Sequence, residues 1–335
     1  MTNDSSRPVS QRLLRVARTL VPITFGVLIA AVVWAEREKL ESLSDAPATD
    51  LLLIGALVMS AHFLNSTEFW VFFRVQGAPI GLLENWMVFL AGHLANHLPA
   101  QAGALYRLQY MSVVHDVPYS KSVAVFGANL FATLGGASVA GLVGTLMLGV
   151  NGSLSVTMIG VYAAMAIAAG GLLLVPVPNV IKGGGRLAKG WRAFREGFDQ
   201  VRSSGRSAVA VVLLEAAKYV ATAWRFQIAF GLLGENQPFW FFLALAPAAG
   251  IARYLAFTPG AIGIREGFIA AAAVALGSPL TTGILAATVD RAVMFATSIV
   301  LGSIGFAASY PRLRRARSAV TTPCDDVDEL LASTS

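Results

Sequence analysis

Long apolar runs separated by short polar stretches make up most of the chain. Several of these runs reach the roughly 20 residues that a helix needs to cross a bilayer. The first is followed by no small-residue cleavage site, so we expect a retained helix there and not a signal peptide. The pattern predicts an all-α integral membrane protein with about six full transmembrane helices. They are expected near Val16–Ala35, Leu51–Phe73, Lys121–Gly149, Leu154–Pro176, Ser207–Gly234 and Leu280–Ser309.

Two further apolar segments, Gly81–Val114 and Pro238–Leu276, are each interrupted near the middle by proline and glycine. Each half has about 15 residues, or roughly 22 Å of helix, which is too short for a hydrocarbon core of about 30 Å. Two short helices around a break predict a re-entrant hairpin, which enters and leaves the membrane on the same side. Irregular backbone at that depth must be covered by protein or water.

The two broken segments share a local motif. The first contains NHLPAQAGALYR and the second contains AFTPGAIGIREG. In each, a glycine follows a proline four positions later, at Pro99 and Gly103 and at Pro259 and Gly263. This P-x-x-x-G pattern is weak by itself, so a chance match is the alternative to a true repeat.

The context of the motif favours a repeat. Each broken segment lies between two long spans, and a polar residue follows each proline after about thirty positions, at Asn129 and Asp290. We therefore expect one repeat over about 51–149 and a second over about 207–309. In the predicted topology the hairpins enter from opposite sides, so the repeats are inverted. Paired breaks in inverted repeats indicate a transporter site near the middle of the membrane.

Composition and charge agree with this topology. The chain is 56% hydrophobic and 13% charged, with a mean hydropathy of +0.65, whereas soluble proteins are about 25% charged. Basic residues gather in the tail 1–15, the loop 178–206 and the tail 310–335, while the loop Glu36–Asp50 is acidic. The positive-inside rule places both termini in the cytoplasm, with one transmembrane domain over 16–309 in the cell inner membrane. The net charge of +6 thus reflects topology and contact with anionic headgroups, and no nucleic-acid partner is expected.

A second group of charged residues lies within the apolar segments. A charge at the bilayer centre costs about 2.5–3.5 kcal/mol, so these side chains must face a protein interior or a wet cavity. Glu215 and Lys218 are three residues apart and can pair on one helix face. For every member of the group, structural pairing between helices is the alternative to a functional role. The group comprises Arg107, Lys218, Arg225, Arg253, Arg265, Arg291, Glu68, Glu84, Glu215, Glu266 and Asp290.

The second hairpin is a candidate anion site. Its tip is expected at Pro259 to Gly263, where a half-helix starts whose N–H groups attract negative charge. Arg265 falls in the first turn and can hold a phosphate oxygen, and Gly260 and Gly263 let a headgroup approach the backbone. Glu266 is expected to neutralise the empty site. The alternative is a structural network of Arg265 and Glu266 that closes the hairpin.

Other residues are expected to complete the substrate path. Arg253 is the expected partner of Glu266. The first hairpin carries a glycine and an arginine after its proline, as the second hairpin does. Charged residues of the long spans are expected to lie near the two hairpins. These considerations add Asn96, Pro99, Gly103, Arg107, Lys218 and Asp290 to the predicted substrate-binding residues. The candidate coupling residues are Glu68, His62 and Asn129, with Asp290 as a further proton carrier.

Motifs for catalysis and metal binding are weak or missing. His93 and His97 are four residues apart, as in a metal pair, but no third ligand lies at a recognisable spacing. The chain has no G-x-S-x-G elbow, no P-loop and a single cysteine, Cys324. We therefore expect no metal, no cofactor and no enzymatic activity. An intramembrane enzyme with Glu68, His93 or Asp290 as acid or base is the alternative.

The hairpin motifs resemble those of a known family. The stretch PGAIGIRE, Pro259 to Glu266, is similar to the late motif of the transmembrane, flippase-like domain of the lysylphosphatidylglycerol synthase family. Its earlier motif is matched at Asn96, Pro99, Gly103 and Arg107. Ala104 stands where the family often has an acidic residue, which argues against proton or cation coupling at that position. The resemblance covers roughly Leu51 to Ser309.

The resemblance implies a lipid flippase or a transporter of lipid-linked sugars. Some members carry a soluble aminoacyl-transferase domain, for which the acidic tail Asp325–Glu329 is too short, so we expect a stand-alone member. Our hypothesis is a transporter that moves an anionic lipid or a polyprenyl-phosphate-linked glycan between leaflets. The alternative is a non-catalytic accessory subunit, which binds lipid or regulates a partner glycosyltransferase through the basic loop Lys182–Arg206.

Overall fold

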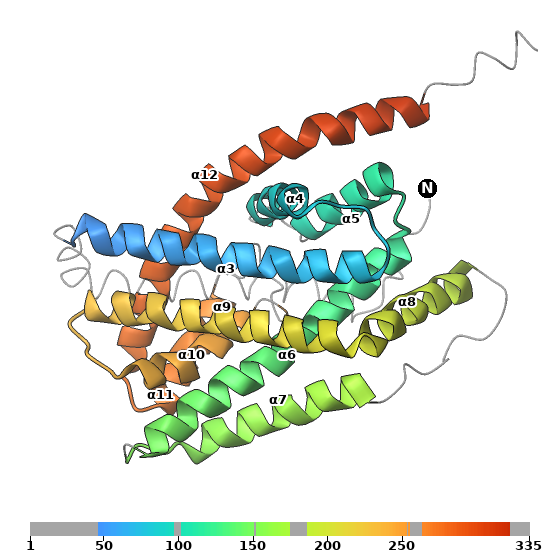
Figure 1. Cartoon of the computed structure of the whole chain (residues 1–335). Helices are drawn as coiled ribbons and strands as arrows, with labels where there is room; N and C mark the ends of the chain where they lie inside the picture. The colour runs from blue at the N-terminus through green and yellow to red at the C-terminus, as the bar shows by residue number, and fades with distance from the viewer. Residues whose placement is uncertain are drawn as a thin grey trace, which may run out of the picture.

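The computed structural model describes residues 46–96, 102–150, 152–174, 186–252, 254 and 263–321 of the 335-residue chain. Within these ranges the regular structure is entirely α-helical, so the predicted all-α membrane fold is confirmed (Figure 1). The helices are α3 (Ala48–Val75), α4 (Leu82–Ala95), α5 (Ala102–His115), α6 (Tyr119–Val150), α7 (Val156–Leu174), α8 (Arg186–Ser203), α9 (Gly205–Gly231), α10 (Phe239–Ala252), α11 (Ile264–Ala275) and α12 (Leu280–Thr321).

Four of these helices, α3, α6, α9 and α12, are long and apolar enough to cross a membrane. They correspond to four of the about six predicted spans. The predicted span Leu154–Pro176 appears as α7, whose apolar part, Val156–Gly171, is shorter. The predicted span Val16–Ala35 lies outside the described residues.

Two pairs of short helices occupy the broken segments. α4, α5 and α10 have 14 residues each and α11 has 12, or roughly 18–21 Å of helix. The arms of each pair pack against each other, as expected for hairpins. Pro99, Arg253, Pro259 and Gly260 lie outside the described residues.

The order long, short, short, long occurs twice, in α3 to α6 and in α9 to α12. The first helices of the two sets, α3 and α9, lie side by side (Figure 1). Two apolar cores surround the two hairpins, and each core also includes residues of the other set, such as Val211 of α9 in the first and Leu148 of α6 in the second. Phe72, Phe89 and Tyr110 are buried in the first, whereas Phe226 and Phe242 are buried in the second. Each hairpin also packs closely on a long helix of the other set, α4 on α12 and α10 on α6.

Small residues let the helices approach closely, as is common in membranes, where packing rather than exclusion of water holds helices together. At Gly305 of α12, a Cβ atom would lie 2.5 Å from the carbonyl oxygen of Met87 in α4. At Gly144 of α6, it would lie 2.5 Å from the backbone nitrogen of Ala244 in α10. Both hairpins are thus pressed directly against a long helix.

Two segments differ from the sequence-based expectation. The basic stretch 178–206, expected to be a loop, contains the helix α8. Phe194 and Phe198 of α8 pack against Gly127 of α6, at 3.5 and 3.8 Å from the position of a glycine Cβ. The last helix also runs beyond its predicted end at Ser309, through Pro311, to Thr321.

Candidate functional site

The start of α11 is fixed by Gly263 and Glu266. Gly263 has φ of 83°, a conformation that glycine adopts without steric cost. Its backbone N–H donates to Oε2 of Glu266 at 2.8 Å, so one of the unpaired amides of the helix start is satisfied. Arg265 lies in the same first turn, as predicted, and is buried.

Arg265 and Arg225 share one carboxylate, that of Asp290. Arg225 of α9 binds it with two hydrogen bonds, from Nε to Oδ1 at 2.7 Å and from Nη2 to Oδ2 at 2.6 Å. Nη2 of Arg265 donates to Oδ2 as well. Asp290 is completely buried, and the arginines are 4% and 7% exposed. Because two guanidinium groups face a single carboxylate, one positive charge is left over in a site of low polarity.

The remaining hydrogen-bonding capacity lies on Arg265. Its Nη1 is buried and has no hydrogen-bond partner in the part of the chain that the structure describes. A buried donor without a partner costs free energy, and a guanidinium matches the oxygens of a phosphate or carboxylate. The site can therefore accept an anionic oxygen at this nitrogen.

Glu266 has a different partner from the one expected. Arg291 of α12 forms an ion pair with Oε1 of Glu266, while the expected partner, Arg253, lies outside the described residues. Asp290 and Arg291 are neighbours but have different partners, Arg225 and Arg265 for Asp290 and Glu266 for Arg291, because successive residues of a helix point about 100° apart. We refer to Arg225, Arg265, Glu266, Asp290 and Arg291 as the arginine cluster.

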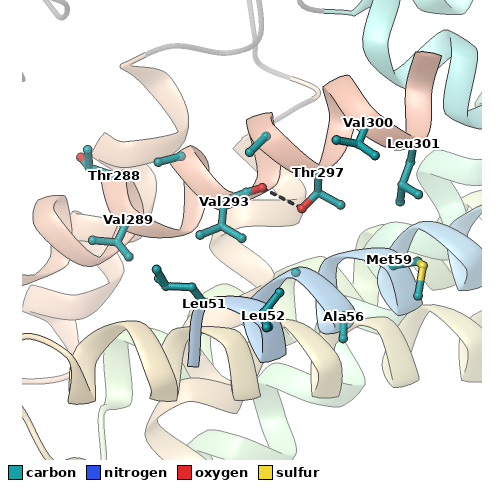
Figure 2. Close-up of a pocket in the computed structure, with 13 residues that line it drawn as sticks. Leu51, Leu52, Ala56, Met59, Thr288, Val289, Val293, Thr297, Val300 and Leu301 are labelled. Atoms are coloured by element: carbon teal, nitrogen blue, oxygen red, sulfur yellow. Dashed lines mark hydrogen bonds between the residues drawn. The ribbon is translucent and has the colours of Figure 1, made fainter. Parts of the chain in front are cut away.

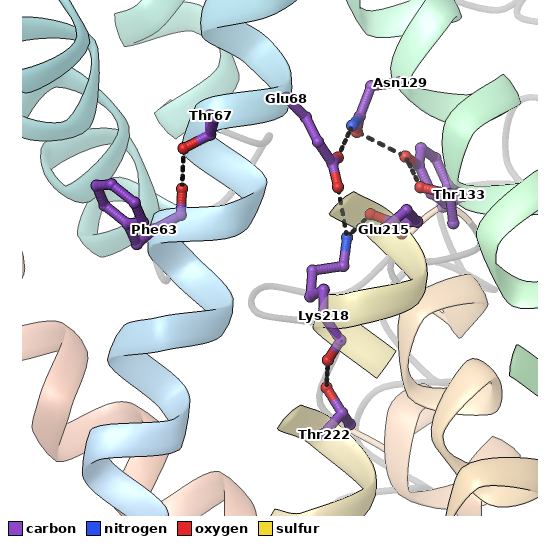
Figure 3. Close-up of polar contacts among 9 residues, drawn as sticks. Phe63, Thr67, Glu68, Asn129, Thr133, Glu215, Lys218 and Thr222 are labelled. Carbon is purple, nitrogen blue, oxygen red and sulfur yellow. Dashed lines mark hydrogen bonds and ion pairs between the residues drawn. The ribbon is translucent and has the colours of Figure 1, made fainter. Parts of the chain in front are cut away.

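A second polar group, the lysine network, joins the two helix sets (Figure 3). Lys218 of α9 pairs with Glu215 on its own helix, as predicted, and its Nζ lies 4.0 Å from Oε1 of Glu68 in α3. Nδ2 of Asn129 in α6 donates to Oε2 of Glu68 at 3.0 Å. The hydroxyl of Tyr254 donates to Oδ1 of Asn129 at 2.8 Å. The network thus links three long helices through buried groups.

The first hairpin holds its arginine differently. The guanidinium of Arg107 lies over the rings of Phe69, Phe89 and Phe126, at 4.5, 5.1 and 5.0 Å from their centroids. Cation–π contacts of this kind are strongest where water is excluded. Arg107 of the first hairpin is therefore surrounded by aromatic rings, whereas Arg265 of the second hairpin is paired with a carboxylate.

Two further predicted positions lie near this arginine. The side chain of Asn96, at the end of α4, lies against Gly103 at the start of α5, with Oδ1 2.5 Å from the position of a Cβ on Gly103. His62 of α3 and His93 of α4 have ring centroids 4.0 Å apart. No group of three or more His, Cys, Asp or Glu side chains that could hold a metal lies together among the described residues. His97 lies outside them.

A smaller cluster lies at the base of the first hairpin, around Glu84 in the first turn of α4. Oε1 of Glu84 accepts hydrogen bonds from Tyr110 at 2.7 Å and from Arg312 at 3.1 Å, and Nε2 of His115 lies 3.2 Å away. Burial raises the pKa of Glu84, but Tyr110, His115 and Arg312 together outweigh it and hold the pKa below its ordinary value of 4.5. The extension of α12 is thereby tied to both arms of the hairpin.

The predicted site residues separate into three groups. Arg265, Glu266 and Asp290 belong to the arginine cluster, and Gly263 donates its backbone N–H to Glu266 of that cluster. Lys218 belongs instead with the candidate coupling residues Glu68 and Asn129, and Asn96, Gly103 and Arg107 form the third group. Sequence reasoning recognised Arg225 and Arg291 as charges within the apolar segments but did not assign them to the site, and it left out Tyr254. Arg225 could have been assigned to the site because it lies seven residues after Lys218, on the same face of α9.

Most of the chain is similar to a known protein family. The model described as the lysylphosphatidylglycerol synthase TM region matches residues 19–302. Among curated proteins, none matches the chain significantly. The matched residues make up most of the chain and include both hairpins, the arginine cluster and the lysine network.

Proposed function

Because the chain belongs to the family of the lysylphosphatidylglycerol synthase transmembrane region, we propose that it is a transporter. Its substrate is an anionic lipid or a polyprenyl-phosphate-linked glycan, which it moves between the leaflets of the inner membrane. The observation that carries this proposal is Arg265, whose buried Nη1 has no hydrogen-bond partner among the described residues. We further propose that the chain is not itself an enzyme, and that any aminoacyl or glycosyl transfer is performed by another protein.

The physical argument concerns the cost of moving a charged headgroup through hydrocarbon. A phosphate in the bilayer core is unfavourable unless fixed charges replace its water. The start of α11 supplies the partial positive charge of a helix N-terminus, and the arginine cluster supplies a surplus guanidinium. A headgroup at Arg265 therefore exchanges water for two favourable electrostatic contacts.

The first hairpin supplies a second cation, Arg107. In the predicted inverted topology the two hairpins enter from opposite sides, so each arginine serves one leaflet. The lysine network lies between the two helix sets and is the candidate element that changes when the headgroup passes from one to the other. Transporters with broken helices commonly move one repeat against the other in this way.

Flipping of a fluorescent anionic lipid in proteoliposomes tests the proposal. A hydrogen bond to a charged group is worth about 1.5–3 kcal/mol, so Arg265→Ala should slow exchange by about tenfold or more. Arg314→Ala, which removes an exposed arginine of α12, is the matched control and should leave exchange unchanged. Equal exchange in wild type and Arg265→Ala would remove Arg265 from the mechanism.

A second function, a non-catalytic accessory subunit that regulates a partner glycosyltransferase, is favoured by a different observation. Phe194 and Phe198 of helix α8 pack inward, while Arg192 of α8 and Arg206 at the start of α9 are exposed. A basic surface of this kind fits an acidic partner protein. Co-purification of a membrane enzyme that is lost in Arg192→Glu/Arg206→Glu, but kept in Arg265→Ala, would support this function over transport.

A further inference from the structure

An apolar groove of about 850 Å³ lies between α3 and α12 (Figure 2). Leu51, Gly55 and Met59 line it from α3, and Val289, Val293 and Thr297 are among the residues that line it from α12. α3 opens the first helix set and α12 closes the second. The groove is therefore formed where the two sets meet.

The groove offers almost no hydrogen-bonding groups. Its two polar side chains, Thr288 and Thr297, donate their hydroxyls to carbonyl oxygens of their own helix, those of Ile284 and Val293, both at 2.8 Å. The other lining side chains are apolar. The groove lining leaves no hydrogen-bonding group for a polar ligand, so the occupant must be a hydrocarbon or an apolar protein surface.

The dimensions favour a thin occupant. The groove follows α12 from Thr288 to Leu301, or about 20 Å of helix. Its volume of about 850 Å³ lies within the roughly 300–1,000 Å³ that is usual for sites of small ligands. At Gly55 the groove has room for little more than a methyl group, since a Cβ there would already be in van der Waals contact with Oγ1 of Thr297, at 3.6 Å. A flexible alkyl or isoprenoid chain fits this space better than a helix does.

Asp290 of the arginine cluster lies next to groove-lining residues along α12. Asp290 follows the lining residue Val289 directly, and seven residues of helix separate it from Thr297. Seven residues make about 700°, so Asp290 and Thr297 point in nearly the same direction around α12. Asp290 holds Arg225 and Arg265, which leave one positive charge in excess. A molecule with an apolar chain in the groove can thus place an anionic group at the arginines.

From this continuity of charge and apolar surface we propose that the groove binds one hydrocarbon chain of the lipid whose anionic headgroup binds at Arg265. The inference rests on the proposed function and adds to it that the transported molecule keeps a chain between α3 and α12. The protein then recognises its substrate in two parts, by charge at the cluster and by chain length along the groove.

Two probes with the same headgroup separate these parts, namely long-chain phosphatidic acid and its short-chain analogue. Ala296→Trp fills the groove at an exposed position, and it should weaken binding of the long-chain probe by about tenfold, a loss of about 1.4 kcal/mol. The short-chain probe, which does not reach along the groove, should bind as to wild type. Retained binding of this probe also shows that the variant is folded. Ile167→Trp, on the exposed surface of α7, is the control and should change neither affinity.

Arg265→Gln distinguishes failure of the inference from failure of the proposed function. If headgroup binding is correct, this variant weakens both probes. Loss of both probes in Arg265→Gln, together with unchanged long-chain binding in Ala296→Trp, would overturn the groove alone. Unchanged binding of both probes in Arg265→Gln would overturn the headgroup site itself. Efficient disulfide cross-linking of two copies through Ala296→Cys, in a Cys324→Ser background, would identify a second copy as the occupant and also overturn the inference.

Discussion

Gly92 of α4 and Gly103 of α5 meet backbone to backbone near the closed end of the first hairpin. A Cβ atom on Gly103 would overlap the carbonyl oxygen of Gly92, and one on Gly92 would lie 2.9 Å from the carbonyl oxygen of Gly103. Neither glycine has a positive φ. Both positions therefore require glycine because a side chain would not fit between the two backbones. The contact brings Asn96 against Gly103 and places the aliphatic part of Arg107 against Gly92.

Gly103→Ala should therefore force the arms of the hairpin apart. Overpacking of a tight interior contact costs about 1–3 kcal/mol, and here the obstacle is backbone that cannot turn away. We expect a lower thermal midpoint in detergent and a shift of Arg107 away from its aromatic rings. Gly160→Ala in α7, where nothing lies within 4 Å of the new Cβ, is the matched control and should not lower the midpoint. A midpoint for Gly103→Ala equal to that of the control would mean that the arms are not closely packed in the membrane.

Asp290→Asn should make stability depend on an added anion. Asp290 is the only carboxylate that either Arg225 or Arg265 contacts among the described residues, and removing one partner of a buried ion pair costs about 3–5 kcal/mol. Asparagine keeps the shape but not the charge, so the arginines should accept an external phosphate instead. We expect a large drop in thermal midpoint, followed by a larger recovery with short-chain phosphatidic acid than wild type shows.

Glu68→Gln is the comparison for this effect, since it removes a buried carboxylate from the lysine network and not from the arginine cluster. It should show no extra recovery with phosphatidic acid. A recovery of the same size in both variants would indicate a general effect of the lipid, and Asp290 would then not compete with the headgroup.

The ion cluster at Glu84 should make the stability of the protein depend on pH. The pKa of Glu84 is held below its ordinary value of 4.5, so its contribution to stability is complete above that value and is lost as the pH falls through the lowered pKa. Glu84→Gln should therefore be less stable than wild type near neutral pH, and the difference should disappear in acid. The ion pair between Glu84 and Arg312 contributes at most about 1 kcal/mol to the stability, because the side chain of Arg312 is 60% exposed. Thermal midpoints of both proteins across an acidic pH series would reveal a constant difference if Glu84 had no such role.

Much of the fold could be predicted because the relevant signals are local. Helix length, apolar runs and the paired breaks by proline and glycine identify the long helices and the short arms of the hairpins. The helix α8 was missed because its many basic residues suggested a loop. Trp191, Phe194 and Phe198 are spaced three and four residues apart, which is the period of an amphipathic helix, and their apolar face packs on α6.

The site was predictable only in part, because its partners come from helices far apart in the sequence. Burial requires Arg265, Glu266 and Asp290 to find partners, which sequence reasoning could anticipate. Which partner each one finds depends on how α9 and α11 are rotated against α12, and glycine contacts such as that of Gly283 with Ala270 set this packing. No local pattern reports that rotation, so Arg225 and Arg291 were not assigned to the site.

Lys218 provides the last prediction, which concerns how the lysine network joins the two helix sets. Its ammonium lies between the buried carboxylates of Glu215 and Glu68, so Lys218→Met should cost about 3–5 kcal/mol by leaving buried charges without their cation. Neutralising the nearer carboxylate as well, in Lys218→Met/Glu215→Gln, should restore part of the loss, because groups in contact are not additive. A matched double variant, Lys218→Met/Glu84→Gln, should restore nothing, since Glu84 belongs to the cluster at the base of the first hairpin. A midpoint of Lys218→Met/Glu215→Gln no higher than that of Lys218→Met alone would show that Lys218 and Glu215 do not stabilise each other within the membrane.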